Sequence, residues 1–127
     1  MLDKILIVDD DDLVLACFER MLSRHFNIET AMGPDAALEA ISANGPYAVV
    51  LSDLRMPGMN GVQLLQKVKT IAPNIVGVVL SGNVETGDVE SASQTVFRIL
   101  DKPCPTVVLT NTLTEAIDQH HKLCATN

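Results

Sequence analysis

The amino-acid sequence predicts an α/β fold, a doubly wound parallel sheet with helices packed on both of its faces. Two observations predict it. Five short aliphatic runs alternate with longer segments in which apolar residues recur at helical spacing. Several runs are apolar at nearly every position, as expected for strands that are buried on both faces of a parallel sheet. Regular strand–helix alternation implies right-handed crossovers and a single sheet covered on both sides.

The five runs expected to form strands are rich in Val and Ile, which pack well in pleated structure. They are residues 4–8, 27–31, 47–52, 75–80 and 96–100. The second run is more polar than the others, so we expect it at an edge of the sheet. Asn44-Gly45-Pro46 is expected to end the second helix, and the Pro and Gly residues of DLRMPGMNG, residues 53–61, predict a loop.

The helices expected between these strands begin at residues that favour helix starts. Asp11 or Asp12 can cap the first helix, Gly33-Pro34-Asp35 opens the second, and Asn60 caps the third. The last helix is expected over residues 105–121.

Helical spacing also predicts which side chains face the sheet. It places Cys17 on the sheet side of the first helix and makes Ile71 a candidate for that side of the third. Residues 86–95 fit only a weak helix, because Gly87 and several Ser and Thr residues lower the helix propensity.

Composition and charge limit the possible functions. The chain has 127 residues, enough for one domain, and a net charge of -7, which disfavours direct binding to nucleic acid. No apolar stretch approaches the length that spans a membrane, and no signal peptide precedes the first strand. The cysteines, Cys17, Cys104 and Cys124, are far apart, so reduced thiols and a cytoplasmic location are expected. The three histidines lie away from the strand ends and are given no catalytic role.

Polar residues gather where the expected strands end. Asp9 and Asp10 follow the first strand, Asp53 the third, Ser81 the fourth and Lys102 the fifth. Ligands of such sheets bind at the carboxyl ends of the strands, so these residues are expected to share one pocket. Three carboxylates would repel one another there, and a hard divalent cation would relieve the repulsion. Oxygen ligands without sulfur or imidazole favour Mg²⁺.

Four motifs carry a resemblance to a known family. They are ILIVDD, VVLSDLRMPGMNG, VVLSG and DKPCP, in this order along the chain. Together they resemble the receiver domain of two-component response regulators, over essentially the whole chain. The resemblance implies a flavodoxin-like (βα)5 sandwich whose parallel sheet has the order 2-1-3-4-5. It also implies one receiver domain over residues 1–127, either alone or cut from a longer signalling protein.

The resemblance assigns roles to the acidic residues. Asp53 would be the phosphoacceptor, which takes a phosphoryl group from a phosphohistidine of a sensor histidine kinase or phosphotransfer protein. Asp10, Asp53 and the backbone carbonyl of Arg55 would bind Mg²⁺, and Asp9 would act mainly through a metal-bound water. The domain would be a switch with slow self-dephosphorylation and no turnover of a separate substrate.

The same resemblance assigns roles to the other residues of the pocket. Lys102 would contact the phosphoryl oxygens and Ser81 would donate a hydrogen bond to one of them. A phosphoryl group in transfer carries spread negative charge, so cationic partners stabilise it. The peptide bond between Lys102 and Pro103 is expected to be cis. The domain would signal to an output domain or a downstream protein, and the last helices and strands could form a homodimer.

Ile99 departs from the family pattern, which has Tyr or Phe three residues before the lysine. An aromatic side chain there is thought to swing inward after phosphorylation, and a β-branched aliphatic cannot make the same move. We therefore expect the loop at Ser81 and residues 86–95 to carry most of the response.

Three other interpretations stay open. A Mg²⁺-dependent aspartyl phosphatase would place a DxD nucleophile after the first strand, whereas the acids there are adjacent. A flavin-binding module would need a Ser/Thr/Gly-rich loop at that point, where the four aspartates at positions 9–12 would repel a phosphate. A pseudo-receiver would bind partners without phosphate, and the complete set of acids and lysine argues against it.

Overall fold

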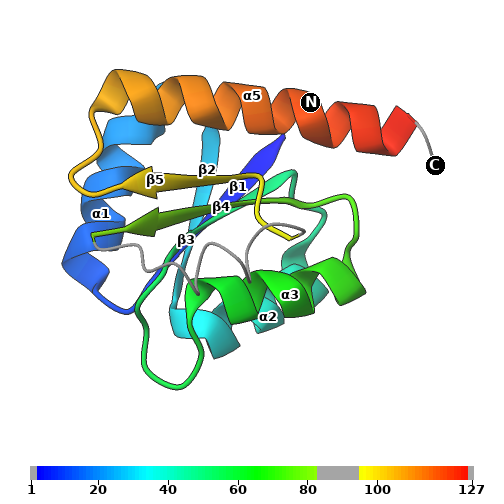
Figure 1. Ribbon diagram of the computed structural model, residues 1–127, viewed down its shortest axis with the longest axis horizontal. Coiled ribbons are helices and arrows are strands. Elements are labelled where there is room, and N and C mark those ends of the chain that lie inside the picture. The colour runs from blue at the N-terminus through cyan, green and yellow to red at the C-terminus, as the bar shows by residue number, and fades with distance from the viewer. Residues whose placement is uncertain (1–2, 83–94, 126–127) are drawn as a thin grey trace.

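Five parallel strands form one sheet in the order β2-β1-β3-β4-β5 (Figure 1). The computed structural model describes residues 3–82 and 95–125. The strands are β1 (Lys4–Asp9), β2 (Asn27–Met32), β3 (Val49–Asp53), β4 (Val76–Ser81) and β5 (Arg98–Asp101). The helices are α1 (Asp12–Leu22), α2 (Gly33–Asn44), α3 (Gly61–Ile71) and α5 (Thr106–Ala125). The predicted fold class and strand order are confirmed.

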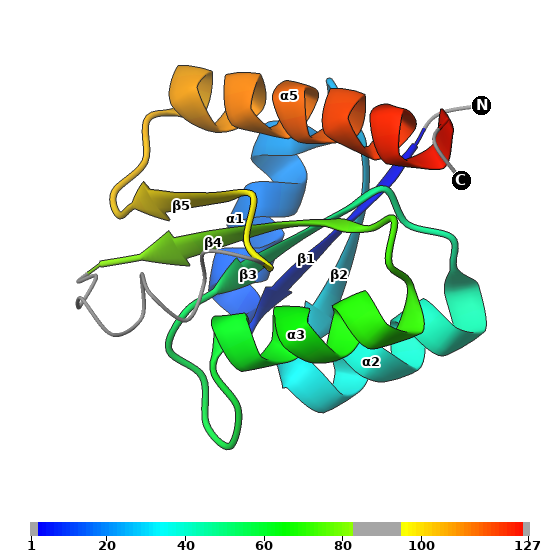
Figure 2. The ribbon, with the colours of Figure 1, turned by 45° about the vertical axis from the view of Figure 1, so that its right-hand side comes forward.

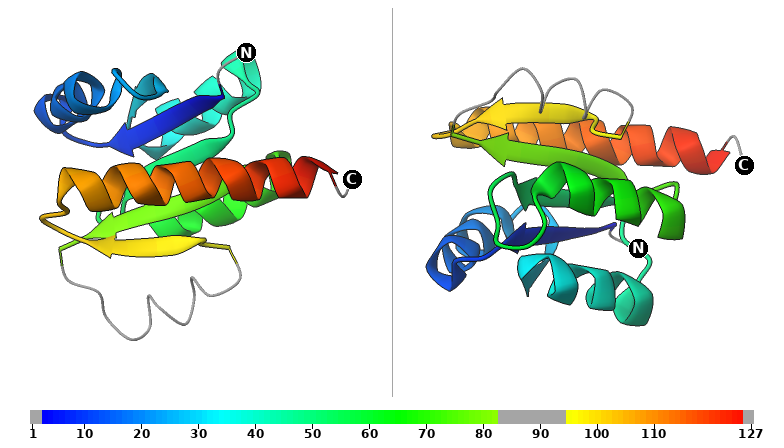
Figure 3. Two further views of the ribbon diagram at one scale, coloured as in Figure 1. Left: turned by 90° about the horizontal axis from the view of Figure 1, so that it is seen from above. Right: turned by 60° about the horizontal axis from the view of Figure 1, so that its bottom comes forward.

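Helices cover both faces of the sheet and bury two separate apolar clusters. Helices α1 and α5 lie on one face and α2 and α3 on the other (Figures 2 and 3). Strand β1 contributes to both clusters, because successive side chains point to opposite faces. Its Leu6 and Val8 pack in the cluster under α2 and α3, whereas Ile5 and Ile7 pack in the cluster under α1 and α5. Burying each such side chain contributes roughly 1.5–3 kcal/mol to folding.

Every strand ends one residue later than predicted from the sequence. The predicted last residues are 8, 31, 52, 80 and 100, and the observed ones are 9, 32, 53, 81 and 101. The apolar runs stop at the predicted points, but the backbone pairing continues through the next residue. Asp9 pairs in register with Met32, Asp53 with Leu80, and Ser81 with Asp101. These side chains are therefore attached to the sheet itself and not to the loops that follow it.

Two helix caps fix the direction of the chain as it leaves the central strands. The Asp11 side chain caps α1 by accepting a hydrogen bond from the backbone N–H of Leu13 at 2.9 Å. Asn60 and Gln63 form a reciprocal capping box at the start of α3, with both hydrogen bonds at 2.9 Å. Such caps typically contribute about 1 kcal/mol each. Both caps were expected from the sequence, α1 with Asp11 or Asp12 as candidates.

Two side-chain predictions are wrong. Cys17 is exposed, because the buried stripe of α1 runs through Leu15 and Leu22 and leaves Cys17 on the outer side. Ile71 is 51% exposed and is the last residue of α3, whose buried residues end at Val68. The weak helix expected over residues 86–95 falls almost entirely outside the described residues. Within the described part of the chain, no helix has the length and apolar character needed to cross a membrane.

Gly61 provides a test of how tightly α3 packs on the strand that carries Asp53. A methyl group at Gly61 would lie 2.5 Å from the Asp53 carbonyl oxygen, and backbone at that position cannot move aside. Alanine normally stabilises a helix by up to about 1 kcal/mol relative to glycine. We expect Gly61→Ala to lower the free energy of unfolding by about 1–3 kcal/mol instead, measured by urea denaturation.

Gly82→Ala is the matched control, since no atom lies within 4 Å of the position that its methyl group would take. It should change the stability by less than about 0.5 kcal/mol. A Gly61→Ala variant with the same free energy of unfolding as the unmodified chain would contradict the close contact between α3 and β3.

Candidate functional site

Polar side chains from four adjacent strands gather at the carboxyl edge of the sheet. Asp9 ends β1, Asp53 ends β3 and Ser81 ends β4, while Asp10 and Lys102 directly follow β1 and β5. Because β1, β3, β4 and β5 are neighbours in this order, their carboxyl ends form a continuous row. The site is thus built from strand ends, which the ladder holds in place.

Three carboxylates form the centre of the site. One oxygen from each of Asp9, Asp10 and Asp53 lies within 4.8 Å of the other two. Asp9 is buried, with 4% of its surface exposed, and the Asp53 side chain is 12% exposed. Asp10 is exposed and forms the outer wall. The backbone N–H of Asp11 donates a hydrogen bond to Asp9 Oδ1 at 3.0 Å and so orients the buried carboxylate.

The surroundings of Asp9 disfavour its charged form. Burial raises the pKa of Asp9 above its ordinary value of 3.8, and the Asp53 carboxylate and Asp10 raise it further. The N–H of Asp11 and the ammonium of Lys102 act in the opposite direction. A second cation beside these carboxylates would favour the ionised state of all three. The cluster is therefore electrostatically suited to bind one.

Lys102 supplies one positive charge to this cluster. Its Nζ lies 2.6 Å from Asp53 Oδ1, and its side chain is 36% exposed. The backbone N–H of Lys102 donates a hydrogen bond to the Ser81 carbonyl oxygen at 3.0 Å, so the lysine leaves the sheet directly beside β4. The peptide bond between Lys102 and Pro103 is cis, as predicted. One ammonium against three carboxylates leaves the ionised group net negative.

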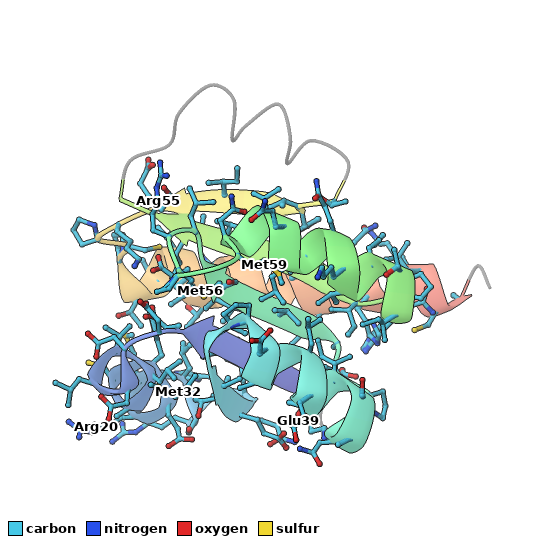
Figure 4. The ribbon with its side chains drawn as sticks, turned by 90° about the horizontal axis from the view of Figure 1, so that it is seen from below. Arg20, Met32, Glu39, Arg55, Met56 and Met59 are labelled. Carbon is cyan, nitrogen blue, oxygen red and sulfur yellow. The ribbon has the colours of Figure 1, made fainter. Side chains whose placement is uncertain are left out.

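Ser81 and Arg55 lie at the sides of the site. Ser81 is almost fully buried at the end of β4, one strand away from Asp53. Arg55 is exposed on the loop between β3 and α3, where Figure 4 shows it with Met56 and Met59. A hydrogen bond from Ser81 to a phosphoryl group and a metal contact from the Arg55 carbonyl both stay predictions. Met56 and Met59 pack against the cluster under α2 and α3.

The donor set of the site fits Mg²⁺. The three carboxylates offer only hard, charged oxygen atoms, which bind Mg²⁺ and Ca²⁺ in preference to softer transition metals. Two of them come from adjacent residues and the third from the neighbouring strand, so the group can hold a small cation at its open side.

Exposed apolar residues at the helix starts beside the site were not predicted from the sequence. Leu13 is 77% exposed at the start of α1, and Val107 and Val108 are exposed at the start of α5. These helices begin where the chain leaves Asp10 and Lys102. Helical spacing could have identified them, because Leu13 and Val107 fall outside the stripes formed by Leu15 and Leu109.

Comparisons with known proteins agree with this geometry. The sequence profile of the response regulator receiver domain matches residues 5–114. The hydrogenase transcriptional regulatory protein HoxA of Cupriavidus necator is 30% identical over 116 residues, which are 90% of this chain and 24% of HoxA. The DNA-binding transcriptional regulator NtrC of Klebsiella pneumoniae is 33% identical over 99 residues, 76% of this chain and 21% of NtrC. The chain thus spans about a quarter of the length of these relatives.

Solved structures show the same fold. The crystal structure of an adenylate cyclase from Rhodopirellula baltica has a TM-score of 0.90 and 34% identity, and the match covers 99% of this chain and 95% of that one. A CheY-like response regulator receiver domain from Methanospirillum hungatei has a TM-score of 0.89 and 25% identity, covering 96% and 98% of the two chains. The matched profile, the fold and the row of strand-end residues place this chain in the response regulator receiver domain family, whose members are phosphorylation-dependent signalling domains of two-component systems.

Proposed function

We propose that this domain accepts a phosphoryl group on Asp53 from a phosphohistidine of a sensor histidine kinase or phosphotransfer protein. The observation that carries the proposal is the 2.6 Å contact between Lys102 Nζ and Asp53 Oδ1 within a cluster of three carboxylates. This ion pair sets a cation directly beside the carboxylate that would act as the nucleophile. It also places a cation where negative charge gathers during transfer.

The residues of this chain account for each part of the proposed transfer. An oxygen of Asp53 forms a bond to phosphorus while the bond from phosphorus to the donor imidazole nitrogen breaks and that nitrogen keeps the electron pair. Lys102 shifts from the carboxylate to a phosphoryl oxygen, which its flexible stem permits. Ser81 donates a hydrogen bond to another phosphoryl oxygen. Asp9, Asp10 and Asp53, with the carbonyl of Arg55, would hold Mg²⁺, which when bound neutralises charge on the phosphoryl oxygens.

The surface beside the site supports a protein donor over a small molecule. Leu13, Val107 and Val108 are exposed apolar side chains at the starts of the two helices that flank Asp10 and Lys102. Apolar side chains near a polar reaction centre are typical of contacts buried by a protein partner. The donor would contact these residues while its phosphohistidine reaches Asp53.

We further propose that the output is carried outside this domain, by an attached domain or a separate protein. The relatives are described as transcriptional regulators, and one similar structure as an adenylate cyclase, so related domains accompany different outputs. The net charge of -7 supports a domain that does not itself bind nucleic acid. A cytoplasmic location fits a kinase partner. A homodimer through α5 and β5 stays a further option.

Ile99 supports a signalling route that differs from rotation of an aromatic residue. It is half-buried on β5 and packs against the cluster under α2 and α3, with Val79 as its register partner on β4. A β-branched side chain in such a position has few alternative rotamers. The response would therefore pass through Ser81 and the segment that follows it, which lies outside the described residues.

Phosphorylation of Asp53 can be tested directly with a small donor. Incubation with acetyl phosphate and Mg²⁺ should add the mass of one phosphoryl group, measured on the intact protein. Asp53→Asn should abolish the addition, whereas Asp12→Asn, which removes an exposed carboxylate outside the cluster, should leave it unchanged.

The mass measurement and an assay of phosphatase turnover separate the alternative functions. A pseudo-receiver would gain no mass in the unmodified chain. An aspartyl phosphatase would hydrolyse para-nitrophenyl phosphate over many turnovers, whereas we expect none. Labelling of Asp53→Asn at the rate of the unmodified chain would assign the phosphoacceptor to another residue.

Mg²⁺ should stabilise the fold at neutral pH. The pKa of Asp9 is raised in the folded state. Asp9 therefore contributes to folding stability only at low pH, and this contribution is lost as the pH rises through the raised pKa. Mg²⁺ at about ten times its Kd should add about 1.4 kcal/mol, or about 5 °C in Tm. Asp10→Asn should remove most of this rise and Asp12→Asn should not. The rise should also disappear in acid, and an equal rise at low pH would indicate a different cation site.

Lys102 should have opposite effects on metal binding and on phosphorylation. Lys102→Met removes the only cation that contacts Asp53 among the described residues, so Mg²⁺ should bind more tightly by isothermal titration calorimetry. The rate of labelling by acetyl phosphate should nevertheless fall by about 10²–10³-fold, as after loss of a charge-stabilising group. A fall in both quantities would instead indicate a disturbed fold, which the Tm of the variant would reveal.

A further inference from the structure

One cavity lies at the amino edge of the sheet, away from Asp53. Its volume is about 350 Å³, within the range of small-molecule sites. It lies between the ends of α2 and α3 and the last turns of α5. In its wall, Ile75 directly precedes β4 and Tyr47 lies two residues before β3. Most of the wall is apolar, and two of its residues, His120 and Cys124, carry reactive groups.

The two reactive side chains are held in a defined arrangement by Asn74. His120 Nδ1 lies 2.6 Å from the Asn74 carbonyl oxygen, which can only accept a hydrogen bond. The proton of the neutral imidazole is therefore on Nδ1, and the lone pair of Nε2 is free to accept. That Nε2 lies 3.5 Å from Cys124 Sγ, one helical turn further along α5. The Asn74 side-chain amide donates to the same sulfur at 3.7 Å.

This arrangement matches what activates a thiol. A cysteine is a nucleophile as its thiolate, and a histidine oriented by a third group is the usual proton acceptor. Transfer of the Cys124 proton to His120 Nε2 gives a thiolate with an imidazolium on one side and the Asn74 amide on the other. The carboxyl end of a helix opposes an isolated negative charge, but it favours a nearby imidazolium, so its net effect on the pair is small.

We propose that Cys124 is a site of thiol–disulfide exchange with small disulfides that carry an apolar group. The Cys124 thiolate attacks one sulfur of the small disulfide, a bond forms between these two sulfurs, and the original sulfur–sulfur bond breaks. The departing thiolate takes the proton from the His120 imidazolium and leaves as a thiol. The small disulfide is the oxidant and is reduced to one free thiol and one half that stays on Cys124. The apolar group of that half occupies the cavity.

The other two cysteines provide internal references. Cys17 is exposed on α1 and has no hydrogen bond to an imidazole within the described parts of the chain. Cys104 is partly buried, and burial together with the Asp101 carboxylate raises the pKa of its thiol. Reaction at Cys124 can therefore be compared with an exposed thiol that lacks the histidine and with a thiol that is held protonated.

The test is a competition among the three thiols in the unmodified, reduced chain. A limiting amount of dipyridyl disulfide is added, the remaining thiols are blocked, and each cysteine is quantified by peptide mass spectrometry. We expect Cys124 to react at least about ten-fold faster than Cys17, and Cys104 to be slowest. Equal rates at Cys124 and Cys17 would overturn the proposal without the need for any variant.

Two substitutions separate the contribution of the imidazole from that of simple exposure. His120→Gln should reduce the rate at Cys124 to that at Cys17. His121→Gln is the matched control: it removes the neighbouring imidazole, which pairs with Asp3, and should leave the ratio unchanged. If both variants keep the fast reaction, His120 does not activate the thiol and the proposal fails.

Selection of the apolar group by the cavity is tested with a second disulfide and with a variant whose cavity is filled by a larger side chain. The ratio of the rates at Cys124 and Cys17 should be several-fold larger with dipyridyl disulfide than with the polar hydroxyethyl disulfide. Ala72→Leu, which extends a side chain of the cavity wall, should bring the two ratios together. Identical ratios with both reagents in the unmodified chain would show that the cavity does not select the apolar group.

Discussion

The repulsion among three carboxylates is the constraint that organises the carboxyl edge of this molecule. Backbone pairing holds β1 and β3, which end at Asp9 and Asp53, and Asp10 directly follows β1, so the three carboxylates are kept close together. The sheet offsets the repulsion between these charges, because its strand β1 is buried on both faces. A stable core thus maintains an electrostatically unfavourable site, and that unfavourable charge is what the proposed cation binding would relieve.

Lys102 balances this charge only in part, which suits a reversible switch. A fully neutralised site would have little attraction for Mg²⁺, whereas a site without the lysine would repel an incoming phosphoryl group. The lysine directly follows an edge strand of only four residues, and its partly exposed side chain contacts the carboxylate of Asp53. The carboxylates and the ammonium therefore have different origins in the fold, the carboxylates at the inner strands β1 and β3 and the ammonium at the edge strand β5.

Much of this arrangement follows from the sequence, because the carboxyl ends of parallel strands meet at one edge. Once the apolar runs are recognised, the residues after them must be neighbours, and this is why Asp9, Asp53 and Lys102 could be predicted together. No comparable rule predicts which residues of helices and distant loops contact one another. The pair formed by His120 and Asn74 joins positions separated by 46 residues, and no periodicity in the sequence indicates it. The exposure of Cys17 was missed for a related reason, since helical spacing alone does not give the width of a buried stripe.

The continuation of the ladder through the last residue of each strand has a consequence for how such domains diversify. Asp9, Asp53 and Ser81 are fixed by pairing within the sheet, so the outer parts of the segments between strand and helix can change without displacing these three side chains. Those segments and the helix starts beside them, which carry Leu13 and Val107, are the surface that another protein meets first. The side chains held by the ladder and the surface that a partner meets are therefore encoded in different parts of the chain, and only Asp10, Arg55 and Lys102 belong to both the site and the connecting segments. Duplicated copies could acquire new partners by loop substitution while their shared chemistry remains unaltered.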